Sequence, residues 1–156
     1  MIELDTYSQT VLEAAKEVFE TMIFMEIEPS QEEKSLTNAG IIGTITYKGS
    51  LEGCLAFRTT NSCAEAIAQN MLAGDEDSLS QEDVCDAVGE IVNMVMGSIK
   101  TRLHNESSVE VSIPSVITGS ELRNVLGENT QQAVVRICLD VEHEAEIIFQ
   151  YRKGQA

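Results

Sequence analysis

Residues 86–97 read Asp86-Ala-Val-Gly-Glu90-Ile-Val-Asn93-Met-Val-Met-Gly97. They lie in a stretch from Ser80 to about Leu103 that contains neither proline nor a cluster of turn residues, which predicts one long helix. Ser80 and Asp83 have the spacing of a capping box at its start. At roughly 100° per residue the helix separates two faces. The buried stripe comprises Val84, Val88, Ile91, Val92, Val95 and Ile99, and the opposite face carries Asp86, Glu90, Asn93 and Gly97.

The segments around this helix predict an α+β fold. Apolar residues recur at helical spacing from Thr6 to about Met25, and we expect Pro29 to end that element. The apolar face of this first helix comprises Val11, Ala14, Ala15, Val18, Phe19 and Met22. Residues 37–59, interrupted at 48–50, are typical of a β-hairpin, and a short helix is expected over 61–71.

The last third of the chain alternates apolar and polar residues, which is typical of half-buried strands. We expect these strands at residues 109–113, 116–118, 133–140 and 145–151, with an acidic loop earlier at 74–78 and a turn at 127–129. The sequence therefore predicts one domain, residues 1–156, in which helices pack on one face of a largely antiparallel β-sheet.

Charge and composition narrow the possible partners. The formal net charge is -16 and the pI about 4.3, so most of the surface would repel a phosphate backbone or an anionic lipid leaflet. We expect neither nucleic acid nor membrane as a partner. The opening residues lack a signal peptide's basic start and apolar run, which predicts a cytoplasmic protein.

Most signatures of catalytic and metal sites are absent from the sequence. There is no phosphate-binding glycine loop, nucleophile elbow or H-E-x-x-H pattern. His104 and His143 are the only histidines and have no cysteine at ligand spacing, so we expect no metal site and no bound cofactor. The four cysteines occur in apolar periodic segments without a C-x-x-C pair, which predicts buried free thiols.

The exposed face of the long helix remains as the candidate site. Glu90 and Asn93, three residues apart, would have Cβ atoms about 5–6 Å from each other, close enough to act on one reacting centre. Gly97 stands one turn further, where a glycine costs about 1 kcal/mol relative to alanine and suggests close approach of another backbone. The alternative is an ordinary solvated face. Met94, at the border, is either a partial core residue or a partner contact, and Arg102 is expected to complement the helix dipole.

At this helix the pattern D-x-x-x-E-x-x-N-x-x-x-G resembles the signature of the CheC/CheX/FliY family of chemotaxis phosphatases. Three further segments resemble the first helix, the hairpin and the region after the motif helix in CheX-type members of that family. These are Ala15-Lys-Glu-Val-Phe-Glu-Thr-Met22, Gly40-Ile-Ile-Gly43 and Ile113-Pro-Ser-Val-Ile-Thr-Gly119. The first helix offers no second E-x-x-N, so the resemblance is to the CheX type with one active centre per chain.

The resemblance implies a phosphatase that removes phosphate from the aspartyl-phosphate of a CheY-type response regulator. It implies that Asn93 orients the attacking water and that Glu90 engages the regulator's invariant lysine. Asp86, Met94, Gly97 and Lys100 would contact the regulator, with Lys100 offsetting the acidic charge locally. It further implies that Mg²⁺ comes with the regulator and that the protein is a homodimer joined through its β-sheet.

Two other functions remain open at the level of sequence. A non-catalytic adaptor, like the related flagellar switch proteins, would use the same architecture only for binding. A phosphatase of the same fold could act on a response regulator outside motility. The intact Glu90 and Asn93 pair favours catalysis over the adaptor, and the sequence does not choose the regulator.

Overall fold

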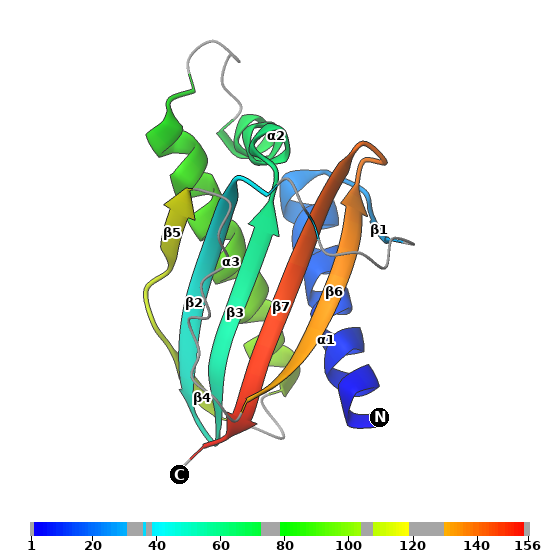
Figure 1. The fold of residues 1–156 in the computed structure, drawn as a ribbon, viewed down its shortest axis with the longest axis vertical. Helices are drawn as coiled ribbons and strands as arrows, with labels where there is room; N and C mark the ends of the chain where they lie inside the picture. Colours follow the sequence, from blue (N-terminus) through cyan, green and yellow to red (C-terminus); the bar gives the residue numbers. More distant parts are fainter. Residues whose placement is uncertain are drawn as a thin grey trace.

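The computed structural model describes residues 2–30, 36, 39–72, 79–103, 108–118 and 130–154 (Figure 1). Within them seven strands form one antiparallel sheet in the order β1-β6-β7-β3-β2-β4, with β5 pairing the first half of β2 and β4 its second half. The strands are β1 (Ile27–Pro29), β2 (Ile41–Gly49), β3 (Leu51–Thr59), β4 (Val109–Val111), β5 (Ser115–Thr118), β6 (Gln131–Leu139) and β7 (His143–Lys153).

The helices pack against the sheet as the sequence predicts. They are α1 (Ile2–Val18), continued by the π-helical segment η1 (Phe19–Ile23), then α2 (Asn61–Leu72) and α3 (Gln81–Leu103). Figure 1 shows α1 and α3 lying behind the same face of the sheet, with α2 at its upper end. Helix α3 covers β2 and β3, and α1 covers β6 and β7. The predicted α+β class, with helices on one face of an antiparallel sheet, is confirmed.

Helix α3 begins and packs as predicted. The Asp83 backbone N–H donates to Ser80 Oγ at 3.1 Å and the Ser80 N–H donates to the Asp83 carboxylate at 3.0 Å, which is the reciprocal bonding of a capping box. All six residues of the predicted apolar stripe are buried. At Gly43 of β2, a Cβ atom would lie 2.9 Å from methyl groups of both Val88 and Val92. The missing side chain therefore lets α3 lie directly on the hairpin.

The first helix differs from the prediction at its C-terminal end. Val11, Ala14, Ala15, Val18 and Phe19 are buried as expected, but Met22 is 59% exposed. The chain widens into the π-helical turn η1, so Ile23 takes the buried position that α-helical spacing would give Met22. The helix then ends at Phe24, which adopts a left-handed conformation. Pro29 lies in β1, so its predicted role as helix terminator is wrong.

Other predictions are confirmed or refined by the described residues. The hairpin and the short helix match β2, β3 and α2, and the C-terminal strands match β4 to β7 within a few residues. The acidic loop at 74–78 and the turn at 127–129 lie outside the described residues.

All four cysteines are free, but only Cys54 and Cys63 are buried. Burial raises the pKa of each of those two thiols to about 11. Cys85 and Cys138 are half-buried, contrary to expectation.

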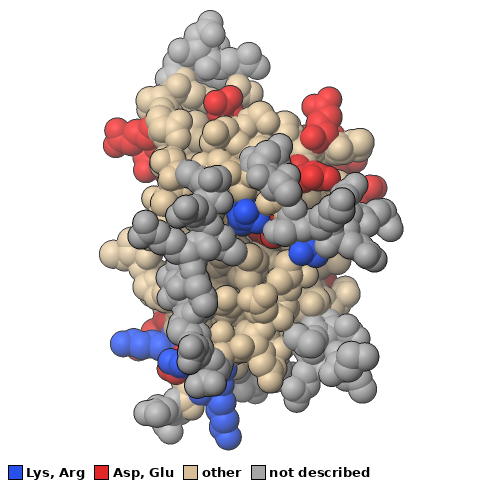
Figure 2. Space-filling model, viewed as in Figure 1, with Lys and Arg blue, Asp and Glu red and all other residues tan. Residues whose placement is uncertain are grey.

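The opposite face of the sheet carries its own polar contacts. Glu146 of β7 is only 3% exposed and pairs with Arg58 of β3 at 3.5 Å and with Arg136 of β6 at 3.6 Å. Figure 2, viewed onto this side, shows acidic side chains mostly around the upper part and basic ones both in the middle and at the lower end. None of the helices in the described residues is long and apolar enough to cross a membrane.

Replacing Gly43 tests the contact between α3 and β2. We expect Gly43→Val to lower the free energy of unfolding by about 1–3 kcal/mol, because the added methyl groups overlap Val88 and Val92. Chemical denaturation measures this change, and Lys48→Val, at an exposed position of the same strand, is the control. If Gly43→Val had the wild-type free energy of unfolding, the close packing of α3 against Gly43 would be contradicted.

Candidate functional site

The long helix presents the predicted exposed face. Asp86, Glu90, Asn93, Gly97 and Lys100 are all exposed. Their spacing of four, three, four and three residues keeps them on one side of α3. The five predicted residues thus form a continuous stripe along the helix, which we call the α3 stripe.

Glu90 and Asn93 occupy the middle of the α3 stripe, and their side chains are available to a partner. Neither side chain makes a hydrogen bond or ion pair with another residue that the structure describes. On the opposite side of the helix, Ile91 and Val92 are fully buried in the core. The two functional groups therefore project from a backbone held firmly from behind, so they can act on a partner without breaking internal contacts.

Gly97 has no packing role within the described structure. A Cβ atom there would meet no heavy atom within 4 Å, in contrast to Gly89 of the same helix, where it would lie 3.4 Å from Val116. A glycine inside a helix costs about 1 kcal/mol relative to alanine. The open space is consistent with the predicted close approach of another molecule at Gly97.

A groove opens beside Gly97, between α3 and the first helix. Its volume is about 420 Å³, and it is lined by Glu17, Val18, Thr21, Met22, Met94, Gly97, Ser98, Thr101 and Arg102. Met94 is half-buried and packs against the core, which confirms the partial-core interpretation; it also lines this groove, and its contact with a partner stays a prediction. Thr21 and Met22 were not predicted as surface residues beside the groove, because α-helical periodicity assigns Met22 to the core.

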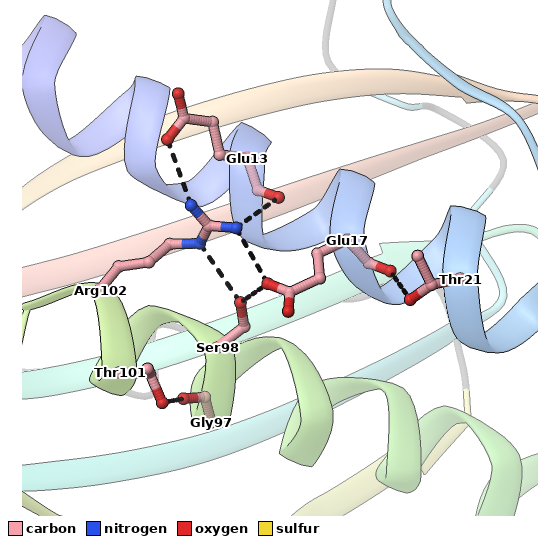
Figure 3. Close-up of polar contacts among 7 residues, drawn as sticks. All are labelled: Glu13, Glu17, Thr21, Gly97, Ser98, Thr101 and Arg102. Carbon is pink, nitrogen blue, oxygen red and sulfur yellow. Dashed lines mark hydrogen bonds and ion pairs between the residues drawn. The ribbon is translucent and has the colours of Figure 1, made fainter.

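Arg102 lies in the last turn of α3, as its predicted role at the helix dipole requires, and it also joins the two helices next to the groove. Its guanidinium donates to the Glu17 carboxylate at 2.9 Å and to Glu13 at 3.4 Å, and its Nε–H donates to Ser98 Oγ at 3.4 Å (Figure 3). The Ser98 hydroxyl donates in turn to Glu17 at 2.8 Å. The bonds from Ser98 and Arg102 lower the pKa of Glu17. Lys100, by contrast, has no ion-pair partner among the described residues.

The residues present do not form a metal centre in the described part of the chain. No three His, Cys, Asp or Glu side chains there come together in a way that could hold a metal ion. His143 lies in β7, half-buried, and His104 lies outside the described residues.

The fold matches solved structures over nearly its full length. A chemotaxis protein CheX from Vibrio vulnificus superposes with a TM-score of 0.77 at 24% identity, covering 92% of this chain and 95% of that one. A CheX–CheY–BeF₃–Mg²⁺ complex from Borrelia burgdorferi gives 0.74 at 21% identity, covering 94% and 98%. The architecture is thus that of the CheC/CheX-like chemotaxis proteins.

The sequence comparisons place the chain more narrowly. The family model described as "Chemotaxis phosphatase CheX" matches residues 41–138, which include the hairpin and all of α3. The chain belongs to the CheX family. The CheY-P phosphatase CheX of Thermotoga maritima is 27% identical over 84 residues, which is 53% of this chain and 54% of that relative. The matched region therefore spans about half the length of this curated relative.

Substituting Gly97 tests whether the fold needs a glycine there. We expect Gly97→Ala to raise the free energy of unfolding by about 0.5–1 kcal/mol, because alanine favours the helix and its Cβ enters open space. Thermal or denaturant unfolding measures the change. A loss of stability would mean that the glycine serves internal packing and not an external contact.

Proposed function

We propose that this protein is a phosphatase that hydrolyses the aspartyl-phosphate of a CheY-type response regulator. The observation that carries the proposal is the exposed, uncommitted pair Glu90 and Asn93 on the rigid helix of a CheX-family chain. The names of the Thermotoga and Borrelia proteins, a CheY-P phosphatase and a CheX–CheY complex, support this choice of substrate.

Asn93 orients the water that attacks the phosphoryl group. Phosphoryl transfer requires positioning and charge stabilisation more than a new nucleophile, so an amide that holds one water in line is sufficient. A neutral amide also avoids the repulsion that a carboxylate would exert on the phosphate oxygens. The buried side of α3 supports this role, because it holds the backbone of Asn93 in place.

Glu90 engages the invariant lysine of the regulator and aligns the two proteins. One helical turn separates it from Asn93, so both side chains reach the same partner surface. The regulator holds Mg²⁺ and the reactive acyl phosphate, and this chain contributes no metal or cofactor of its own. The Mg²⁺ named in the Borrelia complex is consistent with that division.

The remainder of the α3 stripe, together with Met94, forms the contact surface for the regulator. Asp86 lies N-terminal to the catalytic pair, and Gly97 and Lys100 lie C-terminal to it. Lys100 is exposed and unpaired among the described residues, so it provides a positive charge on a chain whose net charge is -16. Such a charge favours encounter with an acidic regulator.

In this proposal residues 1–156 act as one CheX-like unit in the cytoplasm and pair as a homodimer through the β-sheet. The support is membership of the family, together with edge strands β1, β4 and β5 that pair on one side only among the described strands. Light scattering of the purified protein should give about twice the mass of one chain. A monomeric mass at all concentrations tested would contradict the dimer.

Asn93→Ala should remove most of the phosphatase activity. We expect the stimulated decay of a phosphorylated, Mg²⁺-bound regulator to fall by about 100-fold, equivalent to about 2.7 kcal/mol of barrier, because the attacking water loses its orienting group. The loss of radiolabelled phosphate from the regulator measures the rate. Gln81→Ala, which removes an exposed amide elsewhere on the same helix, is the matched control and should keep the wild-type rate.

The same experiment separates the alternative functions. Wild-type stimulation by Asn93→Ala would reject the proposed mechanism. Equal decay with and without the wild-type protein, accompanied by retained binding, would favour the non-catalytic adaptor. If the protein stimulated decay only of a regulator that does not act in motility, the phosphatase mechanism would stand, but its substrate would belong to another pathway.

Glu90→Ala should weaken engagement of the regulator and lower turnover. The loss of a charge-assisted contact costs about 1.5–3 kcal/mol, so kcat/KM should fall by about tenfold or more. Steady-state kinetics over a range of regulator concentrations measures both parameters. Glu142→Ala removes the same charge from the exposed β6–β7 turn and serves as the control. An unchanged rate at low regulator concentration would reject the role of Glu90.

A further inference from the structure

We propose that the groove between α1, η1 and α3 is a docking site for an uncharged, apolar side chain of the response regulator, next to its phospho-aspartate. This inference rests on the proposed function and extends the contact surface from one helix to two. It assigns a role to Met22 and to the groove that Met22 lines together with Gly97.

The groove lies within reach of any protein that contacts Asn93. A specific interface buries roughly 600–800 Å² on each partner, which corresponds to a disc about 14–16 Å in radius. Gly97 is only about 6 Å from Asn93 along the helix axis. A regulator that brings its phospho-aspartate to Asn93 therefore covers the groove as well.

The polar groups around the groove are already partnered inside the protein, as Figure 3 shows. Glu17, Ser98 and Arg102 bond to one another. The hydroxyl of Thr21 donates to the Glu17 carbonyl, and that of Thr101 donates to the Gly97 carbonyl at 3.1 Å. Because the donors Arg102, Ser98, Thr21 and Thr101 are already engaged, a guest that accepts hydrogen bonds would have to displace these bonds, which favours an apolar one.

Two methionines provide the apolar lining that remains. Met22 is 59% exposed on η1, and Met94 borders the groove from α3. Unbranched thioether side chains adapt to irregular apolar and aromatic surfaces and are often used where a partner is bound. They offer contact area to a guest without fixing its exact shape.

The π-helical turn is the structural feature that creates this surface. With regular α-helical spacing Met22 would join Val18 and Phe19 in the core, but η1 places Ile23 there and turns Met22 outward. Such π-helical turns are uncommon and occur frequently at functional sites. The mid-helix glycine at Gly97 is a second locally unfavourable choice beside the same groove. Both departures open the groove.

The experiment measures binding and turnover separately. The probe is the regulator with Mg²⁺ and beryllofluoride in place of the phosphoryl group, titrated against wild type, Gly97→Ala, Gly97→Leu and Met22→Glu. We expect the Kd to rise with the size of the residue at 97, reaching about tenfold for Gly97→Leu, and to rise similarly for Met22→Glu. The fall in kcat/KM of these variants should follow the rise in Kd. Gln132→Glu adds the same charge on the opposite face of the sheet and should bind as wild type.

The outcomes distinguish this inference from the function on which it rests. Wild-type affinity in both Gly97→Leu and Met22→Glu, with turnover still lost in Asn93→Ala, would overturn the groove and leave the phosphatase intact. A change in oligomeric mass in these variants without a change in regulator affinity would also overturn it, because the groove would then hold a second copy of the chain. Failure of the wild-type protein to bind or dephosphorylate the regulator would overturn both proposals.

Discussion

The packing of α3 onto the hairpin is the constraint on which the rest of the structure depends. Its apolar stripe is buried against β2 and β3, and Gly43 leaves out a side chain that would collide with Val88 and Val92. One side of α3 is buried in this way, and the opposite side is solvent-exposed from Asp86 to Lys100. Glu90 and Asn93 are presented outward for that reason and need no loop or lid to position them.

The first helix, α1 with η1, completes the site because it lines the second side of the groove beside α3. Arg102 holds α3 to α1 through Glu13 and Glu17, but the pairs are exposed, so each contributes little to stability in water. Their importance is geometrical, because they satisfy the polar groups beside the groove and leave the methionines available. A network of surface hydrogen bonds can thus determine which side chains of a docking site remain available for contact, although it stabilises the fold only slightly.

Periodicity anticipated α3, the hairpin and most of the core, because each depends on a local repeat that tertiary contacts reinforce. It failed at Met22, where a single π-helical turn shifts the phase of the helix by one residue. It also gave no sign of the ion pairs of Arg102, whose partners Glu13 and Glu17 lie more than eighty residues away in the chain. Long-range pairing of surface charges has no signature in a local pattern, so only the folded structure could reveal it.

The sequence by itself determined which residues of α3 face outward and which chemistry they carry, because burial of one apolar stripe leaves a single arrangement for the other face. It also carried the E-x-x-N pattern, which lies within the residues 41–138 that match the family model. Only the tertiary structure decided that α1 lies beside Gly97, that Met22 is outside the core and that a groove separates the helices. Those features arise from the relative placement of distant segments, which depends on packing against the shared sheet.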